Sequence, residues 1–206
     1  MVILQGTECR LYYRLVSKLG RVCGGEAMTS RLSAEDVTNA DQAPVPITED
    51  LALEVLALNN AHAVELSWLD PERLALLLRE ACYARRLGTL DAFLLAFDES
   101  AEYDSPNYLW FRRHYSGFVY VDRVVVNPVA RRRGLARVLY DDLFRDAVRA
   151  GHNIIVCEVN SEPPNPASDA FHAGLGFSAV GQASLHGGSK VVRYLARGLK
   201  QVAGLH

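Results

Sequence analysis

The stretch from residue 118 to residue 159 constrains the fold most, because it reads as strand, turn, helix and strand in succession. Residues 118–126 form a long run rich in β-branched side chains, and residues 154–159 are nearly all apolar. Between them, residues 134–150 carry apolar side chains at helical spacing, and Gly151 follows where helix ends prefer glycine. A helix that links two strands lets them run parallel. The stretch therefore predicts a β-α-β unit inside a sheet.

The flanking segments predict additional helices and strands. Thr48-Glu49-Asp50 precedes an apolar helical pattern, and Asp70-Pro71 supplies an N-cap and a first helical position for a second helix. Two β-like runs joined through Gly88-Thr89 predict a hairpin. The remaining predicted elements are a short helix after Ser105-Pro106, a helix at 167–175, and strands at 179–185 and 190–195. The order α-α-β-β-α-β-α-β-α-β-β indicates the α/β class, with a mixed α+β sheet.

The N-terminal part of the chain differs in character from the rest. Residues 1–45 end in a polar and acidic segment with proline, a composition typical of linkers and disordered tails, although a short amphipathic helix at 8–19 is an alternative for their first part. Regular patterns begin at Pro46. We therefore expect an N-terminal extension at 1–45, one domain at 46–198 and a C-terminal tail at 199–206.

Composition excludes several classes of function. The formal net charge is −2, which argues against a nucleic-acid partner. No apolar run approaches the roughly 18 residues that a membrane span needs, so we expect no membrane association. The four cysteines and six histidines show no metal-ligand spacing, so we expect no metal. Cysteines interpreted as free thiols favour a cytoplasmic location.

The turn before the helix at 134–150 has the features of an anion site. Three arginines, Arg131, Arg132 and Arg133, lead into Gly134, which lets the backbone approach a ligand closely. Unpaired N–H groups and the positive end of the helix dipole converge there. The sequence predicts phosphate binding by this turn. The alternative is an ordinary strand–helix junction whose arginines form a solvated face.

Two motifs resemble the GNAT superfamily of acetyltransferases. Residues 131–136 match its cofactor motif [Q/R]-x-x-G-x-[G/A], and the run from Asn165 to Phe177 is similar to its N-x-x-A…Y-x-x-x-G-F segment. One helix and one strand separate the two blocks, as that fold requires. The resemblance covers roughly residues 46–197 and implies a GNAT-type acyl-CoA N-acyltransferase fold with a central β-α-β-α core. It also implies acetyl-CoA as co-substrate.

The resemblance assigns cofactor contacts residue by residue. Backbone N–H groups at the helix start would hold the pyrophosphate, Val126 would pair with pantetheine, and the N–H near Val124 would face the thioester oxygen. Asn165 matches a position that commonly contacts the cofactor. The predicted cofactor residues are thus Val124, Val126, Arg131, Arg132, Arg133, Gly134, Leu135, Ala136, Arg137 and Asn165.

Three residues are candidates for a role in catalysis. Glu158 is a carboxylate inside an apolar strand, where one branch of the family has a base, and Asp122 is a further candidate for that task. The family often uses a tyrosine to protonate the leaving thiolate, and His172 occupies that position here. The alternatives are a paired glutamate and a histidine that only packs. By strand alternation, Asp122 should share a face with Tyr120 and Val124.

The resemblance implies transfer of an acetyl group from acetyl-CoA directly to a primary amine. The acceptor is expected to be a small-molecule amine, or a protein N-terminus or lysine; the alternative is a non-catalytic CoA-binding module that acts as a sensor or partner. Dimers are common in similar folds, so the resemblance allows a homodimer, but the sequence does not fix the oligomeric state. An acceptor pocket is expected from polar and aromatic residues of two regions, Asn59, Asn60, His62, Glu65, Tyr103, Asp104, Tyr108 and Trp110.

Overall fold

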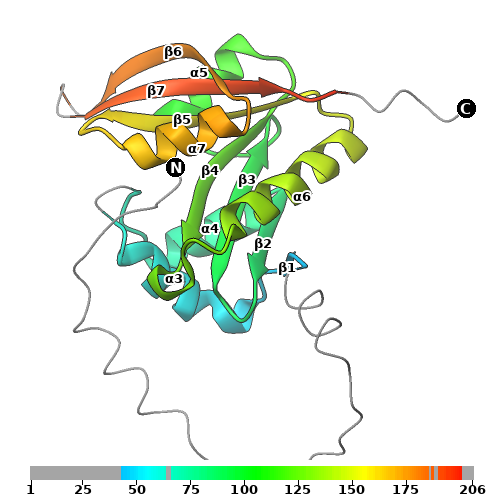
Figure 1. Ribbon diagram of the computed structural model, residues 1–206, viewed down its shortest axis with the longest axis vertical. Coiled ribbons are helices and arrows are strands. Elements are labelled where there is room, and N and C mark those ends of the chain that lie inside the picture. Colours follow the sequence, from blue (N-terminus) through cyan, green and yellow to red (C-terminus); the bar gives the residue numbers. More distant parts are fainter. Residues whose placement is uncertain (1–42, 64–65, 186, 188–189, 201–206) are drawn as a thin grey trace, which may run out of the picture.

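The computed structural model describes residues 43–63, 66–185, 187 and 190–200, which form one seven-stranded sheet with helices on both faces (Figure 1). The strands are β1 (Val45–Pro46), β2 (Tyr83–Leu87), β3 (Ala92–Asp98), β4 (Val119–Val126), β5 (Ile154–Glu162), β6 (Ser178–Leu185) and β7 (Lys190–Gly198). The helices are η1 (Glu49–Leu51), α3 (Ala52–Asn60), α4 (Pro71–Glu80), α5 (Pro106–His114), η2 (Pro128–Ala130), α6 (Leu135–Arg149) and α7 (Pro166–Gly174). The predicted α/β class with a mixed sheet is confirmed.

The sheet has the strand order β1-β2-β3-β4-β5-β7-β6, and its pairs are antiparallel except for β4 with β5. The parallel pair comprises three register positions, Val119–Val121 opposite Ile155–Cys157. Beyond them the two strands diverge, and Figure 1 shows β5, β7 and β6 turning away from the direction of β2, β3 and β4. The sheet is therefore splayed near its middle, at the β-α-β unit that the sequence predicts.

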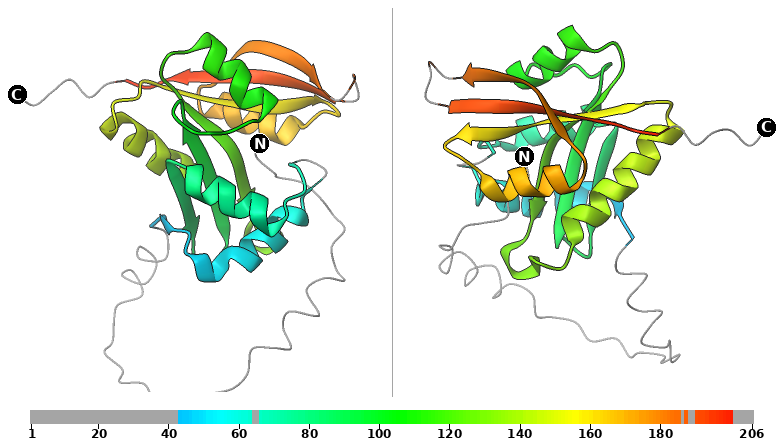
Figure 2. Two further views of the ribbon diagram at one scale, coloured as in Figure 1. Left: turned by 180° about the vertical axis from the view of Figure 1, so that it is seen from behind. Right: turned by 45° about the horizontal axis from the view of Figure 1, so that its top comes forward.

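Helices cover the two faces of the sheet in separate groups, as the views in Figure 2 show. Helices α6 and α7 pack on one face over a core that includes Leu139 and Val121. Helices α3, α4 and α5 pack on the other face over a core that includes Leu77 and Phe111. Strand β3 contributes to both cores because alternate side chains point to opposite faces, Leu94 to the first and Phe93 to the second.

A β-bulge interrupts the alternation in β4. Leu95 pairs with Arg123 and the next residue, Ala96, pairs with Val121, so Asp122 is an additional residue in β4. As a result Val121 and Val124 both belong to the core beneath α6, whereas Tyr120 belongs to the opposite core. The prediction that Val124 shares a face with Tyr120 is wrong, because an inserted residue reverses the facing of everything after it.

Most local signals in the sequence act as predicted. Asp70 Oδ1 accepts a hydrogen bond from Arg73 N at 2.6 Å and caps α4, which begins at Pro71. The Thr48 side chain makes no capping bond, and a short 3-10 turn precedes α3 instead. Strand β1 begins one residue before the predicted domain boundary at 46. The predicted extension up to residue 42 and the tail after residue 200 lie outside the described residues.

Candidate active site

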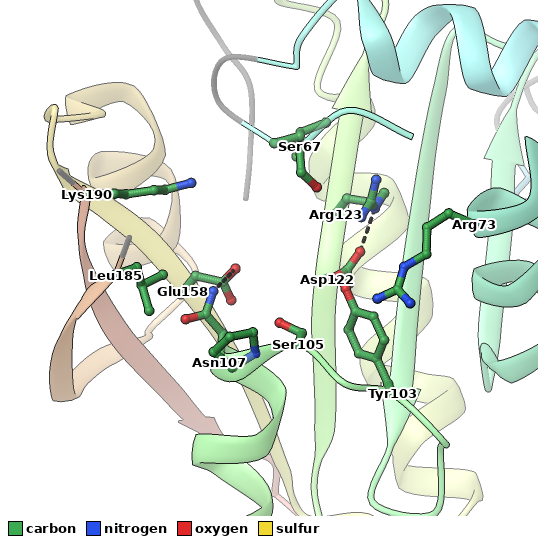
Figure 3. Close-up of a pocket in the computed structure, with 12 residues that line it drawn as sticks. Ser67, Arg73, Tyr103, Ser105, Asn107, Asp122, Arg123, Glu158, Leu185 and Lys190 are labelled. Atoms are coloured by element: carbon green, nitrogen blue, oxygen red, sulfur yellow. Dashed lines mark hydrogen bonds and ion pairs between the residues drawn. The ribbon is translucent and has the colours of Figure 1, made fainter. Parts of the chain in front are cut away.

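A cavity of about 300 Å³ opens where β4 and β5 stop pairing. Val121 and Cys157 form the last register pair, and the next residue of each strand, Asp122 and Glu158, lines the cavity (Figure 3). The other walls come from residues 66–67 after α3, from α4, from residues 103–107 around the start of α5, and from the ends of β6 and β7. The splay of the sheet thus creates a space lined by polar side chains from distant parts of the chain.

Only one of the two oxygens of the Glu158 carboxylate accepts a hydrogen bond from the described residues. Asn107 Nδ2 donates to Oε1 at 3.0 Å, and Asn107 is itself held by a hydrogen bond from Tyr194 Oη at 3.1 Å. Oε2 and the nearby Tyr120 hydroxyl are both buried, and neither has a partner in hydrogen-bond geometry among the described residues. The two groups are nevertheless close enough for each to influence the pKa of the other. Burial raises the pKa of Glu158, and the charge of Asp122 acts in the same direction. A carboxylate of this kind is poised to accept a proton.

A buried network neutralises the β4 side of the cavity. Arg123 Nε donates to Asp122 Oδ2 at 2.5 Å, and both side chains are almost completely buried. Arg123 Nη1 donates to Asn59 Oδ1 at 2.7 Å, and Tyr103 Oη donates to Asp122 Oδ1 at 2.7 Å. The negative charge of Asp122 is therefore fully engaged. This makes Asp122 a weaker candidate for a base than Glu158, because both of its oxygens already accept hydrogen bonds, from Arg123 and from Tyr103.

Lys190 is a cation in the cavity wall that could bind an anionic group of a ligand. It lies at the first position of β7, lines the cavity with Glu158, and extends into the same space (Figure 3). Burial lowers the pKa of Lys190, while the charge of Glu158 opposes this effect. Within the described part of the chain, no ion pair of 4.0 Å or less involves Lys190.

The turn before α6 has an open approach at its glycine. Gly134 is the N-cap of α6 and has φ 77°, a left-handed conformation that favours glycine, and Arg132 has φ 63°. No heavy atom outside its chain neighbours lies within 4 Å of the point where a Cβ on Gly134 would stand. The first N–H groups of a helix lack intrahelical acceptors. The turn therefore offers backbone donors and free space to an anionic group.

The described residues contain no group of three His, Cys, Asp or Glu side chains arranged to hold a metal ion. In the same part of the chain, no helix combines the length and the apolar character needed to cross a bilayer.

The central part of the chain matches a known family. Residues 94–177, which run from β3 through α7, match the model of the acetyltransferase (GNAT) family. Over this range the chain is similar to GNAT-family acetyltransferases. The match includes the β4–α6–β5 unit and the turn at Gly134. It supports acetyl transfer as the general activity of the domain. No curated protein matches the sequence significantly.

Solved structures with the same fold include several N-acetyltransferases. Naa20 of Chaetomium thermophilum, in complex with a bisubstrate analogue, has a TM-score of 0.61 at 18% identity and covers 77% of this chain and 87% of its own. The ribosomal-protein-S18-alanine N-acetyltransferase of Escherichia coli has a TM-score of 0.57 at 16% identity, over 80% and 97% of the two chains. The putative acetyltransferase yncA of Salmonella typhimurium, with acetyl-CoA, has a TM-score of 0.55 at 20% identity, over 80% and 97%. At these identities the likeness concerns the fold.

Most of the predicted donor residues lie between the second half of β4 and the start of α6. Val124 and Val126 pair with β3 on one edge of β4, and the described strands provide no register partner for them on the other edge. Their side chains are buried, so only the backbone is available there. Leu135 and Ala136 are also buried. An open strand edge that leads to the turn at Gly134 fits a long ligand with an anionic end.

The arginines of the turn have partners of their own. Arg133 Nη1 forms an ion pair with Asp91 at 2.8 Å, and Arg137 Nε lies 3.7 Å from Asp141. Arg132 is exposed, and Arg131 is partly buried. Burial lowers the pKa of His62 to about 4, and the nearby charge of Arg131 acts in the same direction. The turn therefore offers its backbone more directly than its guanidinium groups.

The structure does not bring His172 to the cavity. Its side chain is completely buried, Tyr140 Oη lies 3.0 Å from Nε2, and the Ser168 carbonyl lies 2.8 Å from Nδ1. Burial lowers the pKa of His172 to about 3, so the ring is neutral at physiological pH. This location contradicts the expectation of a proton donor to the leaving thiolate, because both ring nitrogens are engaged inside the α6–α7 layer. Asn165 caps α7 by accepting from Ser168 N at 3.1 Å.

The predicted acceptor residues have mixed positions. Tyr103 lines the cavity. Asp104 forms an ion pair with Arg73, and Asn59 accepts a hydrogen bond from Arg123. Four others make local structural contacts: Asn60, which bonds to Leu69, the buried His62, the buried Tyr108, and Trp110, which stacks on Tyr194. Glu65 lies outside the described residues.

Sequence reasoning missed Arg73, Asn107 and Lys190, each of which lines the cavity from a different element. Arg123 also lines the cavity without having been predicted. Its position could have been inferred from the sequence, because a charged pair, Asp122-Arg123, is unusual inside a run of β-branched residues.

Proposed function

We propose that this protein transfers the acetyl group of acetyl-CoA directly to a primary amine bound in the cavity, with Glu158 as general base. The observation that carries the proposal is the position of Glu158, one residue beyond the last β4–β5 pair, with Oε2 buried and unpartnered beside Tyr120. Such a buried polar atom normally has a partner, and an acceptor amine is a suitable one.

Acetyl-CoA, when bound, supplies an acetyl thioester. The open edge of β4 from Val124 to Val126 and the N–H groups from Arg132 to Ala136 would hold it, and the space at Gly134 fits an anionic group. The Arg137 N–H already donates to Gly134 O at 2.9 Å, so Arg137 would contribute only through its side chain. These residues orient the donor by backbone contacts. Arg131, the C-cap of η2, and Asn165, the N-cap of α7, would contribute their side chains to the same ligand.

The residues of the cavity perform the proton chemistry. Glu158 Oε2 accepts the proton that the amine loses as the new N–C bond forms and the C–S bond breaks. The raised pKa of Glu158 makes it a stronger base than an exposed carboxylate, and Asn107 fixes its orientation. Tyr120 keeps its proton because burial raises its pKa, so its hydroxyl can donate a hydrogen bond in the same space. A coenzyme A thiolate is a fair leaving group, and no proton from His172 is needed.

The test is acetyl transfer across an amine panel, with the released thiol measured after mixing the protein with acetyl-CoA. The panel contains alkylamines, aminoglycosides, amino acids, and peptides with free N-termini or lysines. We expect turnover with one class of amine and a product heavier by one acetyl group. Binding of acetyl-CoA without turnover on any amine would instead support a CoA-binding sensor or partner module.

A further inference from the structure

We propose that the acceptor is an amine that carries a carboxylate a few atoms away from its nitrogen. This inference rests on the proposed function and names the substrate class of the same cavity. Its basis is the pattern of charge on the cavity wall, where one anion and one cation have no partner in an ion pair of their own.

Five charged side chains line the cavity, and three of them are already paired. Arg123 is bound to Asp122 at 2.5 Å, with both groups buried. Arg73 is bound to Asp104 at 2.5 Å at the rim. Glu158 and Lys190 remain, the first held by a neutral amide and the second without an ion pair among the described residues. A buried charge without a counter-ion is costly, so the free protein holds two unpaired charges in one cavity.

The two unpaired charges are separated by a gap. No nitrogen–oxygen distance of 4.0 Å or less joins Lys190 to Glu158, although the charge of Glu158 influences the pKa of Lys190. Figure 3 shows Lys190 reaching from β7, and Glu158 from β5, toward the space between β5 and β4. The pair is therefore close enough to interact and too far apart to form a direct ion pair. A ligand can lie between them.

The charge that fits this gap is that of a zwitterion. Its ammonium group would lie against Glu158, which takes the proton before transfer, and its carboxylate would lie against Lys190. A neutral monoamine would leave Lys190 unpaired, and a diamine would place a second cation beside it. The volume of about 300 Å³ is at the small end of ligand pockets, which suits a group of amino-acid size.

An amine with a nearby carboxylate occurs in free α-amino acids and in peptides whose N-terminal residue is followed by an acidic residue. Both present an amine and a carboxylate within a few bonds. The experiment compares each source with a neutral analogue of the same size: L-amino acids against their carboxamides, and peptides starting Met-Asp against peptides starting Met-Asn. The value of kcat/KM is measured by thiol release, and binding of each acceptor is measured by calorimetry.

We expect the wild-type protein to use the carboxylate acceptor about tenfold better than its carboxamide, because a charge-assisted contact to Lys190 is lost in the amide. Lys190→Met should remove most of this preference, chiefly through KM, and Lys190→Arg should restore part of it. Lys200→Met is the matched control, because Lys200 is exposed and does not line the cavity. Preference for the peptide pair or for the amino-acid pair identifies the source.

Equal use of acids and carboxamides, or an equal loss on both in Lys190→Met, would overturn the inference. If neutral amines are acetylated without a carboxylate preference, the proposed function holds and the inference fails. If amino acids bind in a Lys190-dependent manner but no amine is acetylated, the acceptor class holds and the proposed function fails.

Discussion

Replacing Glu158 with glutamine should lower activity and raise stability in the same protein. Glutamine keeps the size of the side chain and can still accept a hydrogen bond from Asn107 Nδ2 through its carbonyl oxygen. It cannot accept the proton of the amine. Loss of a positioned general base costs about 10²- to 10⁴-fold in rate, so we expect kcat/KM to fall by about 100-fold or more.

The stability effect follows from the buried oxygen. Oε2 of Glu158 has no hydrogen-bond partner among the described residues, and leaving such an atom unsatisfied costs about 1–3 kcal/mol. Part of this cost disappears when the charge is removed. In a chain of this length, a gain of about 1 kcal/mol raises Tm by about 2–4 °C.

The stability gain should depend on pH. Burial raises the pKa of Glu158 in the folded protein above its ordinary value of 4.5. The folded state therefore binds this proton more tightly than the unfolded state, and the free energy of unfolding of the wild type falls as pH rises from 4.5 through the folded pKa. Glutamine does not titrate. The Tm difference between variant and wild type should be smallest near pH 4.5 and largest at pH 8.

The assay combines thiol release at pH 7.5 with thermal melting at several pH values. Glu162→Gln is the matched control, because Glu162 is exposed in the same strand and should change neither quantity. The reasoning would be refuted if Glu158→Gln kept kcat/KM within about threefold of the wild type, since a base contributes far more than that. A Tm that fell equally at all pH values would refute the stability argument.

Three further predictions concern other parts of the domain. Saturating acetyl-CoA, at about 100 times its Kd, should add about 2.7 kcal/mol of stability and raise Tm by about 5–10 °C, and Gly134→Glu should abolish this shift because it places an anion in the open space of the turn. His172→Phe should lower Tm by about 2–12 °C, because it leaves the buried Tyr140 hydroxyl unsatisfied, while kcat stays within about twofold; a larger loss of kcat would return His172 to the catalytic site. Gly181→Ala should destabilise the domain by about 1–3 kcal/mol in chemical denaturation, because its Cβ would lie 2.7 Å from the Trp110 ring; an unchanged midpoint would contradict this.

The sequence was sufficient for the order of the elements because each has a strong local cause. Asp70 and Pro71 begin α4 by capping and a fixed φ, and Gly134 begins α6 with a backbone conformation that other residues adopt with strain. Glu158 was visible as a carboxylate in an apolar strand. These signals depend on a few neighbouring residues, and neighbouring residues can be read from one sequence.

The rest of the site depends on contacts between distant elements. Asn107 contacts Glu158, and Lys190 lines the same cavity, where β4 and β5 separate after three positions, and no local pattern encodes where a pairing ends. The bulge at Asp122 is hidden because an additional residue in a β-branched run does not change its composition. His172 follows Phe171 on a short helix, and the sequence does not reveal which face of that helix is buried.

The short pairing between β4 and β5 also limits how many backbone hydrogen bonds join the two halves of the sheet. Four strands lie on one side of it and three on the other, and the sheet crosses it through three register positions. Hydrogen bonding between the two halves is therefore sparse at the place where the donor edge of β4 is open. A ligand that offers amide groups to that edge completes the sheet as a missing piece of backbone would. If acetyl-CoA binds along β4 as proposed, it would bridge the two halves of the sheet, and amide hydrogen exchange along β4 should slow when the donor site fills.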